Sequence, residues 1–495
     1  MANIKSIALG GLSLAAVPAM NAQENHPNVV YIMTDQQSYY MISALSSRLS
    51  PEDPYAGNPY VSTPNLDRLV NSGYTFSNCY AAHPVSGPSR YALLTASSPN
   101  HYGMTGNFSP GGEKGMEMKE NIAERSMGVL FRNAGYRTFY AGKVHLPWAN
   151  GTSGHRSIYE PPYHYGFDEY LTGDDRGELA EVSADFFSEY KGEDPFLLFV
   201  SFMNPHDICM TQVLFNDKQL EDFKTDEIDR RARINQIEWR ETFRRMDQSR
   251  FDTDELASIP ENLARTDVFP YNKSKNQFQL TEHNIRVHRW FYYSLMHQVD
   301  QQIGQVLDAL ENSVYKDNTI IVFTSDHGEL GCSHGLTGKN YPYQECQRVP
   351  LIFAGKNIPQ GVVDKENVIC NGWDMLPTML DLAGLDVPDE FRGESFKKAI
   401  TGGRKVNRKY VYLETVNSYG ILEEGRYKYI RFGGMPDKTV AETEVLFDLK
   451  NDPGELHNLA SDPAYKKKMA ELRKALDKEM KRFDTSFDVF KNKKK

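Results

Sequence analysis

The five residues from Ser86 to Arg90 (Ser-Gly-Pro-Ser-Arg) place a small hydroxyl side chain in a Gly- and Pro-containing turn just before an apolar run. Proline is tolerated in the first turn of a helix, because its missing N–H group would have no helical partner there. Residues 89–96 are therefore predicted to form a helix with Ser86 at its positive end, where unpaired amides favour an anion. This position suits a nucleophile. On its own, the pattern also fits an ordinary helix cap.

Further polar residues follow short runs that are typical of β-strands. Strands are predicted at 29–33, 138–141, 196–202 and 320–323, and the polar residues after them are Asp35, Lys143 with His145, His206, and Asp326. Several runs are apolar at successive positions, as in strands covered on both faces, and helices are predicted between them at 66–70 and 284–310. This alternation predicts an α/β fold, a large and mostly parallel sheet sandwiched by helices. Because such sheets bind ligands beyond the carboxyl ends of their strands, the polar residues should meet in one site.

The carboxylates of Asp35 and Asp326 are hard oxygen ligands of the kind that Ca²⁺ and Mg²⁺ prefer. Each follows a separate predicted strand, so the two could meet at one edge of the sheet. An isolated pair such as Asp326-His327 is more often structural, but a partner carboxylate from another strand favours a metal site. The sequence therefore predicts a divalent-metal site.

Two lysines and two histidines from three regions of the chain could converge on one anionic group. These residues are Lys143, His145, His206 and Lys339. Any one of them alone is weak evidence, because a single Lys or His at a strand end is usually a surface or packed residue. Their occurrence together with the Ser86 turn and the two aspartates indicates a catalytic site.

The Ser86–Arg90 stretch resembles the signature of the type I sulfatases, in the alkaline phosphatase-like superfamily, whose core is Cys or Ser, any residue, Pro, Ser or Ala, and Arg. In that family the first residue is oxidised after translation to Cα-formylglycine. Ser86 resembles the serine-type branch, which a radical-SAM maturase modifies. Other family-like motifs occur in the family's order between about Asn28 and Leu459: Thr34-Asp35-Gln36, Gly142-Lys143-Val144-His145-Leu146, Asn204-Pro205-His206, Ser325-Asp326-His327, His334-Gly335-Leu336-Thr337-Gly338-Lys339 and Leu446-Phe447-Asp448-Leu449.

The resemblance implies a cofactor, one divalent cation with Ca²⁺ as the expected ion. Its ligands would be Asp35, Gln36, Asp326, His327 and the modified Ser86. Gln36 departs from the commoner second Asp of the family and offers a neutral amide oxygen instead of a carboxylate. Fewer negative charges should weaken the metal site without abolishing it.

The resemblance also implies roles for the remaining residues in hydrolysing a sulfate ester. Hydrated formylglycine, held by Arg90 and the metal, would attack sulfur with one hydroxyl. His206 with Lys339 would protonate or stabilise the leaving oxygen, and His145 would take a proton from the second hydroxyl so that sulfate is released. Lys143 would stabilise the nucleophile and the sulfate oxygens by its charge. An unmodified serine would be left as a stable sulfate ester.

The expected substrate is an O-sulfate on a carbohydrate, of glycosaminoglycan type or another sulfated glycan, because the chain resembles bacterial glycan sulfatases. Choline and aryl sulfates are alternatives. His101, Asp207 and His334 are candidates for a sugar subsite, although a packing role fits them equally well. Two other functions stay open: a phosphate or phosphonate ester hydrolase of the same superfamily, and a non-catalytic glycan-binding relative with unmodified Ser86.

The chain has 495 residues with a net charge of −10, which argues against nucleic acid as a partner. Residues 1–22 are interpreted as a signal peptide, with Lys5 as the only charge, an apolar core at 7–17, and Ala19 and Ala22 for cleavage. The apolar core is too short to span a bilayer. We therefore expect a periplasmic or secreted protein without an integral membrane segment.

The remaining chain is predicted to form a catalytic domain at 23–402 and a C-terminal subdomain at 403–495. A charged stretch at 215–275 is predicted to be a solvated helical insertion. In the subdomain, strands at 410–413, 428–432 and 445–449 would form a short antiparallel sheet, and the spacing of apolar residues from 469 to 483 predicts a closing helix. The five cysteines have no metal-type spacing, and their odd number leaves at least one unpaired, so one disulfide is compatible.

Overall fold

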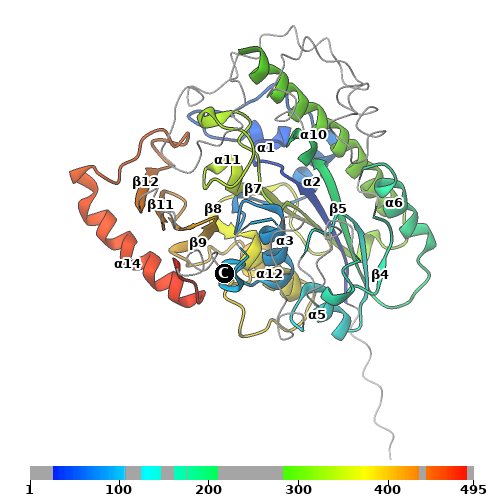
Figure 1. Cartoon of the computed structure of the whole chain (residues 1–495). Coiled ribbons are helices and arrows are strands. Elements are labelled where there is room, and N and C mark those ends of the chain that lie inside the picture. Colours follow the sequence, from blue (N-terminus) through cyan, green and yellow to red (C-terminus); the bar gives the residue numbers. More distant parts are fainter. Residues whose placement is uncertain are drawn as a thin grey trace, which may run out of the picture.

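A computed structural model describes residues 26–104, 106–107, 124–146, 161–173, 176–209, 282–433 and 442–487. The predicted signal peptide and the predicted insertion at 215–275 lie outside these residues. Figure 1 shows a large sheet flanked by helices and a small second sheet beside it, with one long helix on the outer side of the small sheet. None of the helices in the described ranges combines the length and the apolar character needed to cross a membrane.

The large sheet has eight strands and is parallel except for one strand. Its order across the sheet is β4 (Glu169–Tyr170), β3 (Arg137–Gly142), β5 (Phe196–Pro205), β1 (Asn28–Asp35), β6 (Thr319–Ser325), β7 (Arg348–Gly355), β2 (Gly73–Tyr80) and β8 (Val362–Cys370). Only β7 among them runs antiparallel to its neighbours, β6 and β2. The predicted mostly parallel sheet is confirmed, and the neighbouring strands β3, β5, β1 and β6 are those that the sequence placed before polar motifs.

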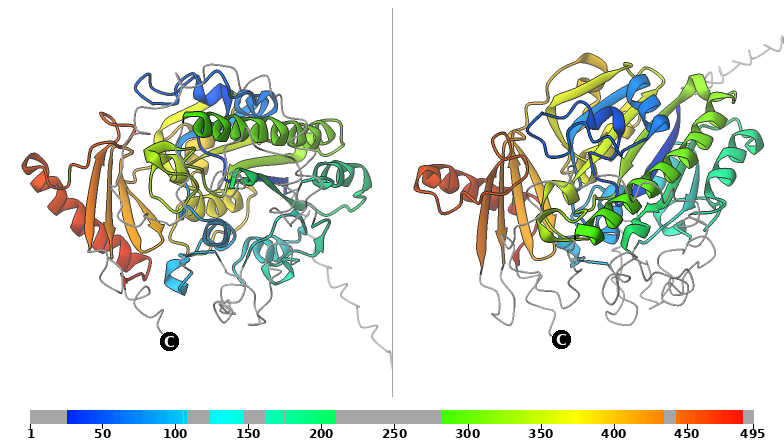
Figure 2. Two further views of the ribbon diagram at one scale, coloured as in Figure 1. Left: turned by 45° about the horizontal axis from the view of Figure 1, so that its top comes forward. Right: turned by 90° about the horizontal axis from the view of Figure 1, so that it is seen from above.

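Helices cover both faces of this sheet, as Figure 2 shows. They are α1 (Ser43–Ser46), α2 (Pro64–Ser72), α3 (Ser86–Thr95), α5 (Met127–Asn133), α6 (Leu179–Glu189), α10 (Glu282–Glu311), α11 (Gln344–Gln347), α12 (Leu376–Leu382) and α13 (Lys397–Gly402). Single helical turns are Asn100–Tyr102, Tyr163–Tyr165, His206–Ile208, Lys316–Asn318, Ser333–Gly335 and the π-helical Asn371–Met375.

Strand β1 shows why its sequence is apolar at successive positions. Val30 and Ile32 pack in the core that contains α2, α6 and α10. Val29, Tyr31 and Met33 point to the opposite face, into the core that contains α3, α5 and α12. Because successive side chains of a strand alternate between faces, a strand buried on both sides needs apolar residues throughout.

The carboxyl ends of the central strands have tight backbone turns that direct polar residues to one edge. Gln36 after β1 and His145 after β3 have φ angles of 74° and 50°, which residues other than glycine rarely adopt. Gly142 has φ 87°, and a Cβ there would lie 2.2 Å from the carbonyl oxygen of Ser201, so this close approach requires glycine. Asp35 is the last residue of β1, and Lys143, His206 and Asp326 directly follow β3, β5 and β6.

The small sheet is antiparallel, in the order β12 (Thr443–Asp448), β11 (Tyr427–Phe432), β10 (Ser418–Glu423) and β9 (Tyr410–Thr415). Helix α14 (Lys466–Arg482), preceded by the turn Pro463–Tyr465, covers it. Met469, Leu472 and Leu476 of α14 are buried against the sheet, as their spacing predicted. Strand β10 was not predicted, because Gly420 interrupts a short run that lacks a clear apolar alternation.

The described cysteines are all free thiols: Cys79, Cys209, Cys332, Cys346 and Cys370. Cys209 lies partly buried beside Gln36, and the other four are buried. The disulfide that the sequence left open is therefore absent from the described residues.

Candidate active site

Ser86 is the first residue of α3 and is fully buried, at the edge where β1 and β6 end. Its hydroxyl Oγ lies 2.9 Å from Nε2 of His327 and 3.5 Å from Oδ1 of Asp35. The ammonium of Lys339 donates a hydrogen bond to the same oxygen at 3.1 Å. The structure thus confirms the predicted helix, which begins at Ser86 itself, and surrounds this hydroxyl with charged and ligating groups.

Arg90, one helical turn after Ser86, joins the two aspartates. Its Nε donates to Oδ2 of Asp326 and its Nη2 to Oδ2 of Asp35, both at 2.9 Å. Its Nη1 donates to the carbonyl of Lys143 and to the hydroxyl of Ser201, at 3.0 and 2.7 Å. The guanidinium is buried and has a partner for each nitrogen, which offsets part of the cost of burying its charge.

Lys143, at the end of β3, adds a second cation on Asp35. Its Nζ lies 2.6 Å from Oδ2 of that carboxylate. Burial alone would raise the pKa of Asp35, but Lys143, His206, Lys339 and Arg90 hold it well below its ordinary value. Burial and the neighbouring Asp35 raise the pKa of Asp326 to about 7. Two adjacent buried carboxylates repel each other, and a bound cation would relieve that repulsion.

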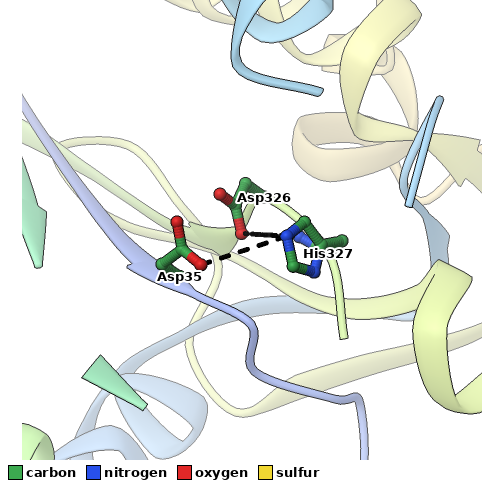
Figure 3. Close-up of side chains that lie close together, drawn as sticks. All are labelled: Asp35, Asp326 and His327. Carbon is green, nitrogen blue, oxygen red and sulfur yellow. Dashed lines mark hydrogen bonds and ion pairs between the residues drawn. The ribbon is translucent and has the colours of Figure 1, made fainter. Parts of the chain in front are cut away.

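Asp35, Asp326 and His327 form a group whose ligand atoms lie within 4.8 Å of one another (Figure 3). The Oδ1 atoms of Asp35 and Asp326 are 3.9 and 3.7 Å from Nε2 of His327. The Oδ2 atoms face Arg90, so each carboxylate directs its other oxygen toward the imidazole.

The tautomer of His327 is set by its neighbour, because Nδ1 lies 2.9 Å from the carbonyl of Gly328. A carbonyl only accepts, so Nδ1 carries the hydrogen and Nε2 keeps its lone pair. Burial also lowers the pKa of His327 well below its ordinary value. Two carboxylate oxygens and a neutral imidazole nitrogen fit a divalent cation, and the predicted ligands from β1 and β6 are brought together.

Gln36 lies beside this group in a left-handed backbone conformation. Its Oε1 accepts a hydrogen bond from Lys339 at 2.8 Å, and its Nε2 donates to the carboxylate of Glu329. Its backbone N–H donates to Oδ1 of Asp326 at 3.1 Å. The amide oxygen is therefore directed to the same ammonium group as the Ser86 hydroxyl.

Two histidines complete the predicted set. His145 is buried, and its Nδ1 has no hydrogen-bond partner in the described structure. Burial and then Lys143 lower the pKa of His145 well below its ordinary value. His206 follows β5 and is partly buried, and burial together with Lys143 and Lys339 lowers its pKa in the same way. These shifts favour the neutral form of both rings, in which one ring nitrogen is an acceptor.

Two of the three predicted subsite residues have partners within the protein. His101 donates from Nδ1 to the carbonyl of Asp484 at 2.6 Å, and its ring packs edge-on against Tyr102. Asp207 is buried and accepts hydrogen bonds of 2.8 and 2.7 Å from the guanidinium of Arg176. This bidentate pair lies directly after His206.

The third, His334, is buried and stacks on Tyr343 with ring centroids 3.5 Å apart. Its Nε2 lies 3.5 Å from Oε2 of Glu345. Substrate contact by His101, Asp207 and His334 therefore stays a prediction, and the packing role weighed for them has clear partners here.

The sequence reasoning missed four groups that contact the site residues. They are Ser201, which binds Arg90, Asn107, which accepts from the N–H of Gly87, Cys209, which contacts Gln36, and Glu329. Glu329 had a usable signal, because it is a carboxylate two residues after His327 in the same turn. The others come from segments without any motif.

Comparison with known proteins agrees with this geometry. A family model described as "Sulfatase" matches residues 27–385, and a second, described as "N-sulphoglucosamine sulphohydrolase, C-terminal", matches residues 332–482. The chain is 28% identical to an N-acetylglucosamine-6-O-sulfatase of Bacteroides thetaiotaomicron, over 96% of this chain and 90% of the relative. It is also 28% identical to a Delta 4,5-hexuronate-2-O-sulfatase of the same organism, over 94% and 91%.

A similar solved structure is that of a protein in complex with its substrate D-glucosamine-2-N,6-O-disulfate, with a TM-score of 0.67 and 25% identity over 93% of this chain and 98% of that one. The "Sulfatase" model alone matches more than half of the chain. The chain therefore belongs to the sulfatase family of sulfuric ester hydrolases, a family that generally uses a metal ion and formylglycine.

Proposed function

We propose that this sulfatase hydrolyses an O-sulfate ester on a carbohydrate, with hydrated formylglycine derived from Ser86 as the nucleophile. The observation that carries the proposal is the convergence of cations at a buried hydroxyl. Lys339 donates to the Ser86 hydroxyl, and Arg90 and Lys143 bind the aspartates beside it. Three cations gathered at one hydroxyl and its two aspartates suit an anionic ester.

The proposed cofactor is one divalent ion, Ca²⁺, held by Asp35, Gln36, Asp326, His327 and the modified Ser86. The donor set of Asp35, Asp326 and His327 supports it, because their ligand atoms already converge. When bound, the ion would stabilise negative charge that develops on the nucleophile and sulfate oxygens.

Other residues of the chain would position the reacting groups, neutralise charge and transfer protons. Arg90 and Lys143 hold the Asp35 carboxylate and orient the end of α3, and the Lys339 ammonium lies where it can neutralise an ester oxygen. A neutral His145 would accept the proton of the second formylglycine hydroxyl, which lets the C–O bond to sulfate break and restores the aldehyde.

Protonation of the leaving oxygen is assigned to His206 together with Lys339. The pKa of His206 is lowered by burial, Lys143 and Lys339, so the free site keeps this imidazole neutral. Binding of an anionic sulfate adds a compensating negative charge, which raises the pKa of a neighbouring imidazole and favours its acidic form. Lys339, whose ammonium donates to the Ser86 hydroxyl, would supply a proton or a positive charge.

The substrate class follows the names of the relatives, which act on sulfated amino sugars and uronates. We infer a sulfated glycan of glycosaminoglycan type, met by a protein in the periplasm or outside the cell after removal of residues 1–22. A radical-SAM maturase would be its transient partner. Which sugar and which sulfate position it selects would be found by screening defined sulfated mono- and disaccharides.

The first test is maturation. Mass spectrometry of the peptide that contains Ser86, taken from an active preparation, should show the loss of two hydrogens. Ser86→Ala should reduce turnover to background while the protein stays folded, because the nucleophile is removed and the buried packing is nearly kept. Full activity of protein with unmodified Ser86 contradicts the proposal.

Parallel kinetics on matched sulfate and phosphate esters identify the reaction class. A higher kcat/KM on the phosphate ester would point to the phosphoryl or phosphonate hydrolase alternative. Glycan binding without turnover by protein with unmodified Ser86 would point to a non-catalytic protein.

The second test separates the two histidines. His206→Ala should lose about 10²–10⁴-fold in rate on a sugar sulfate, the usual contribution of general acid catalysis, and much less on an aryl sulfate whose phenolate leaves readily. His145→Ala should slow release of covalently bound sulfate whichever alcohol has departed. Equal losses on both esters for His206→Ala, with a leaving-group-dependent loss for His145→Ala, would show that the two roles are exchanged.

A further inference from the structure

Glu329 is a fully buried carboxylate in the turn after β6, two residues beyond His327. Its Oε2 accepts a hydrogen bond from the side-chain Nε2 of Gln36. Its Oε1 accepts from the backbone N–H groups of Gly331 at 3.2 Å and Gly338 at 2.6 Å. One carboxylate thus connects the turn after β1 with the segment that ends at Lys339.

The side chain of Gln36 is held between two charges of opposite sign. Its NH₂ group faces Glu329, and its Oε1 faces the ammonium of Lys339 at 2.8 Å. Its backbone is fixed as well, because the hydroxyl of Tyr292 donates to its carbonyl at 2.6 Å. Only one orientation of the amide satisfies both partners, and it directs the oxygen toward Lys339, whose ammonium also binds Ser86.

We propose that Glu329 is a positioning residue that fixes Gln36 as a neutral oxygen ligand, which rests on the divalent-metal site of the proposed function. It also accounts for the glutamine at this position. A carboxylate at position 36 would direct an oxygen at Oε2 of Glu329, and two buried anions in hydrogen-bond contact repel strongly. A neutral amide gives Glu329 a donor and still presents an oxygen to the metal site.

The first variant is Glu329→Gln. Both oxygens of Glu329 accept hydrogen bonds, whereas an amide has a single acceptor oxygen, so one N–H donor must face the introduced NH₂ group. Gln36 loses its fixed orientation in consequence. Loss of a residue that orients a metal ligand typically lowers metal affinity about 10- to 100-fold, and we expect this range for Ca²⁺.

The sharper variant exchanges the two groups, Gln36→Glu with Glu329→Gln in one protein. The introduced amide can then donate to the introduced carboxylate and accept from Gly331 and Gly338, so that every donor has an acceptor. Lys339 keeps an acceptor at position 36. We expect the exchange to bind Ca²⁺ at least as well as the better of the two single variants, and Gln36→Glu alone to bind poorly and to unfold earlier.

The measurement is isothermal titration of Ca²⁺ into mature full-length protein stripped of metal by a chelator, together with the shift in melting temperature that Ca²⁺ causes. Glu414→Gln is the matched control, because Glu414 is also buried and accepts from the hydroxyl of Ser98 and the N–H of Asn100 but contacts no proposed ligand. Its Ca²⁺ affinity should equal that of the wild type.

Gln36→Asn should destabilise the protein less than Gln36→Glu, because asparagine is neutral and tolerates a positive φ. Its side chain is shorter, so its amide should not reach Glu329. It should lose Ca²⁺ affinity, and adding Glu329→Gln should cause little further loss, since both act through one ligand. Additive losses would overturn the positioning role.

Other outcomes separate this inference from the function on which it rests. Wild-type affinity in Glu329→Gln, or an exchange variant weaker than both single variants, overturns the role of Glu329 alone if the wild type binds Ca²⁺. A wild-type protein that binds no Ca²⁺ overturns the metal site and the positioning role together.

Discussion

Two groups of buried charges in the described part of the chain can be compared. The first, here the Ser86 cluster, lies at the carboxyl ends of the central strands. It consists of Asp35, Ser86, Arg90, Lys143, Asp326, His327 and Lys339. The second, here the Lys428 cluster, lies where the small sheet meets the loop before β7. It consists of His334, Glu345, Lys428 and Glu455.

The Lys428 cluster has two carboxylates for one lysine, and the ligand atoms of His334, Glu345 and Glu455 also lie within 4.8 Å of one another. Lys428 pairs with Oε1 of Glu455 and donates to the carbonyl of Pro342 at 2.6 Å, while Oε2 of Glu455 accepts from the N–H of Gln344 at 2.7 Å. Tyr55 donates to Oε1 of Glu345 at 3.1 Å, on the side away from His334. The ion pair of Lys428 and Glu455 is balanced, whereas Oε2 of Glu345 faces Nε2 of His334 at 3.5 Å, a nitrogen without a hydrogen bond in the described structure.

The Ser86 cluster is richer in cations. Arg90, Lys143 and Lys339 converge on two aspartates and one hydroxyl, and the backbone turns at Gln36 and His145 have positive φ. Such features are retained where a ligand completes the arrangement. Burial of charge alone therefore does not mark a functional site, whereas the convergence of several cations on one buried hydroxyl does.

The largest effect on activity is expected for a substitution of Asp326 in the Ser86 cluster. Asp326→Asn keeps an oxygen for the N–H groups of Gln36 and His327 but removes a carboxylate whose pKa is raised to about 7 by burial and by Asp35. Activity should fall on the order of 10³-fold, the scale of metal stabilisation in such sites. Exhaustive chelation of the wild type should cause a similar loss.

Stability should respond less than activity, because the weakened ion pair with Arg90 is offset by the removal of the repulsion between two adjacent buried carboxylates. We expect the free energy of unfolding of the metal-free protein to change by no more than about 1–2 kcal/mol. Urea unfolding of both proteins under chelator measures this difference. A severe loss of stability with activity retained per folded molecule would place Asp326 with the structural residues.

Sequence reasoning identified the Ser86 cluster but gave only hints of the Lys428 cluster. Asp35 and Asp326 could be placed together because each follows an apolar strand, and parallel strands end at one edge. His334 was predicted from the sequence as part of the motif that ends at Lys339 and as a candidate for a sugar subsite. The other members of the cluster, Lys428 and Glu455, lie in the small sheet and in a distant loop. A local pattern in the sequence does not predict contacts over such distances along the chain.

The same limit applies to Glu329 and to β10. Glu329 lies in the predicted metal turn, but its partner Gln36 is 293 residues away, so the hydrogen bond becomes visible only in the fold. Strand β10 pairs with β9 and β11 through its backbone, which compensates for the weak strand propensity around Gly420. In both cases the structure depends on contacts between distant parts of the chain, which a local sequence pattern does not show.

The last and smallest effect on activity is expected at Lys428. Lys428→Met removes the ammonium and leaves Glu455 buried without its ion-pair partner. Burial already raises the pKa of Glu455 although Lys428 opposes this shift, so the carboxylate has little other compensation. Breaking a buried ion pair on one side typically costs about 3–5 kcal/mol in stability, and we expect this range in urea unfolding.

Removing the second charge of the Lys428–Glu455 pair as well should restore stability. Lys428→Met with Glu455→Gln removes both charges, so the double variant should regain a large part of the loss. Below the unfolding transition, kcat/KM per folded molecule and Ca²⁺ affinity should stay near wild type in both proteins, because neither residue contacts the Ser86 cluster among the described contacts. If Lys428→Met instead lowers kcat/KM at full folding, the segment from His334 to Glu345 transmits its geometry to Lys339, and the two clusters are a single functional unit.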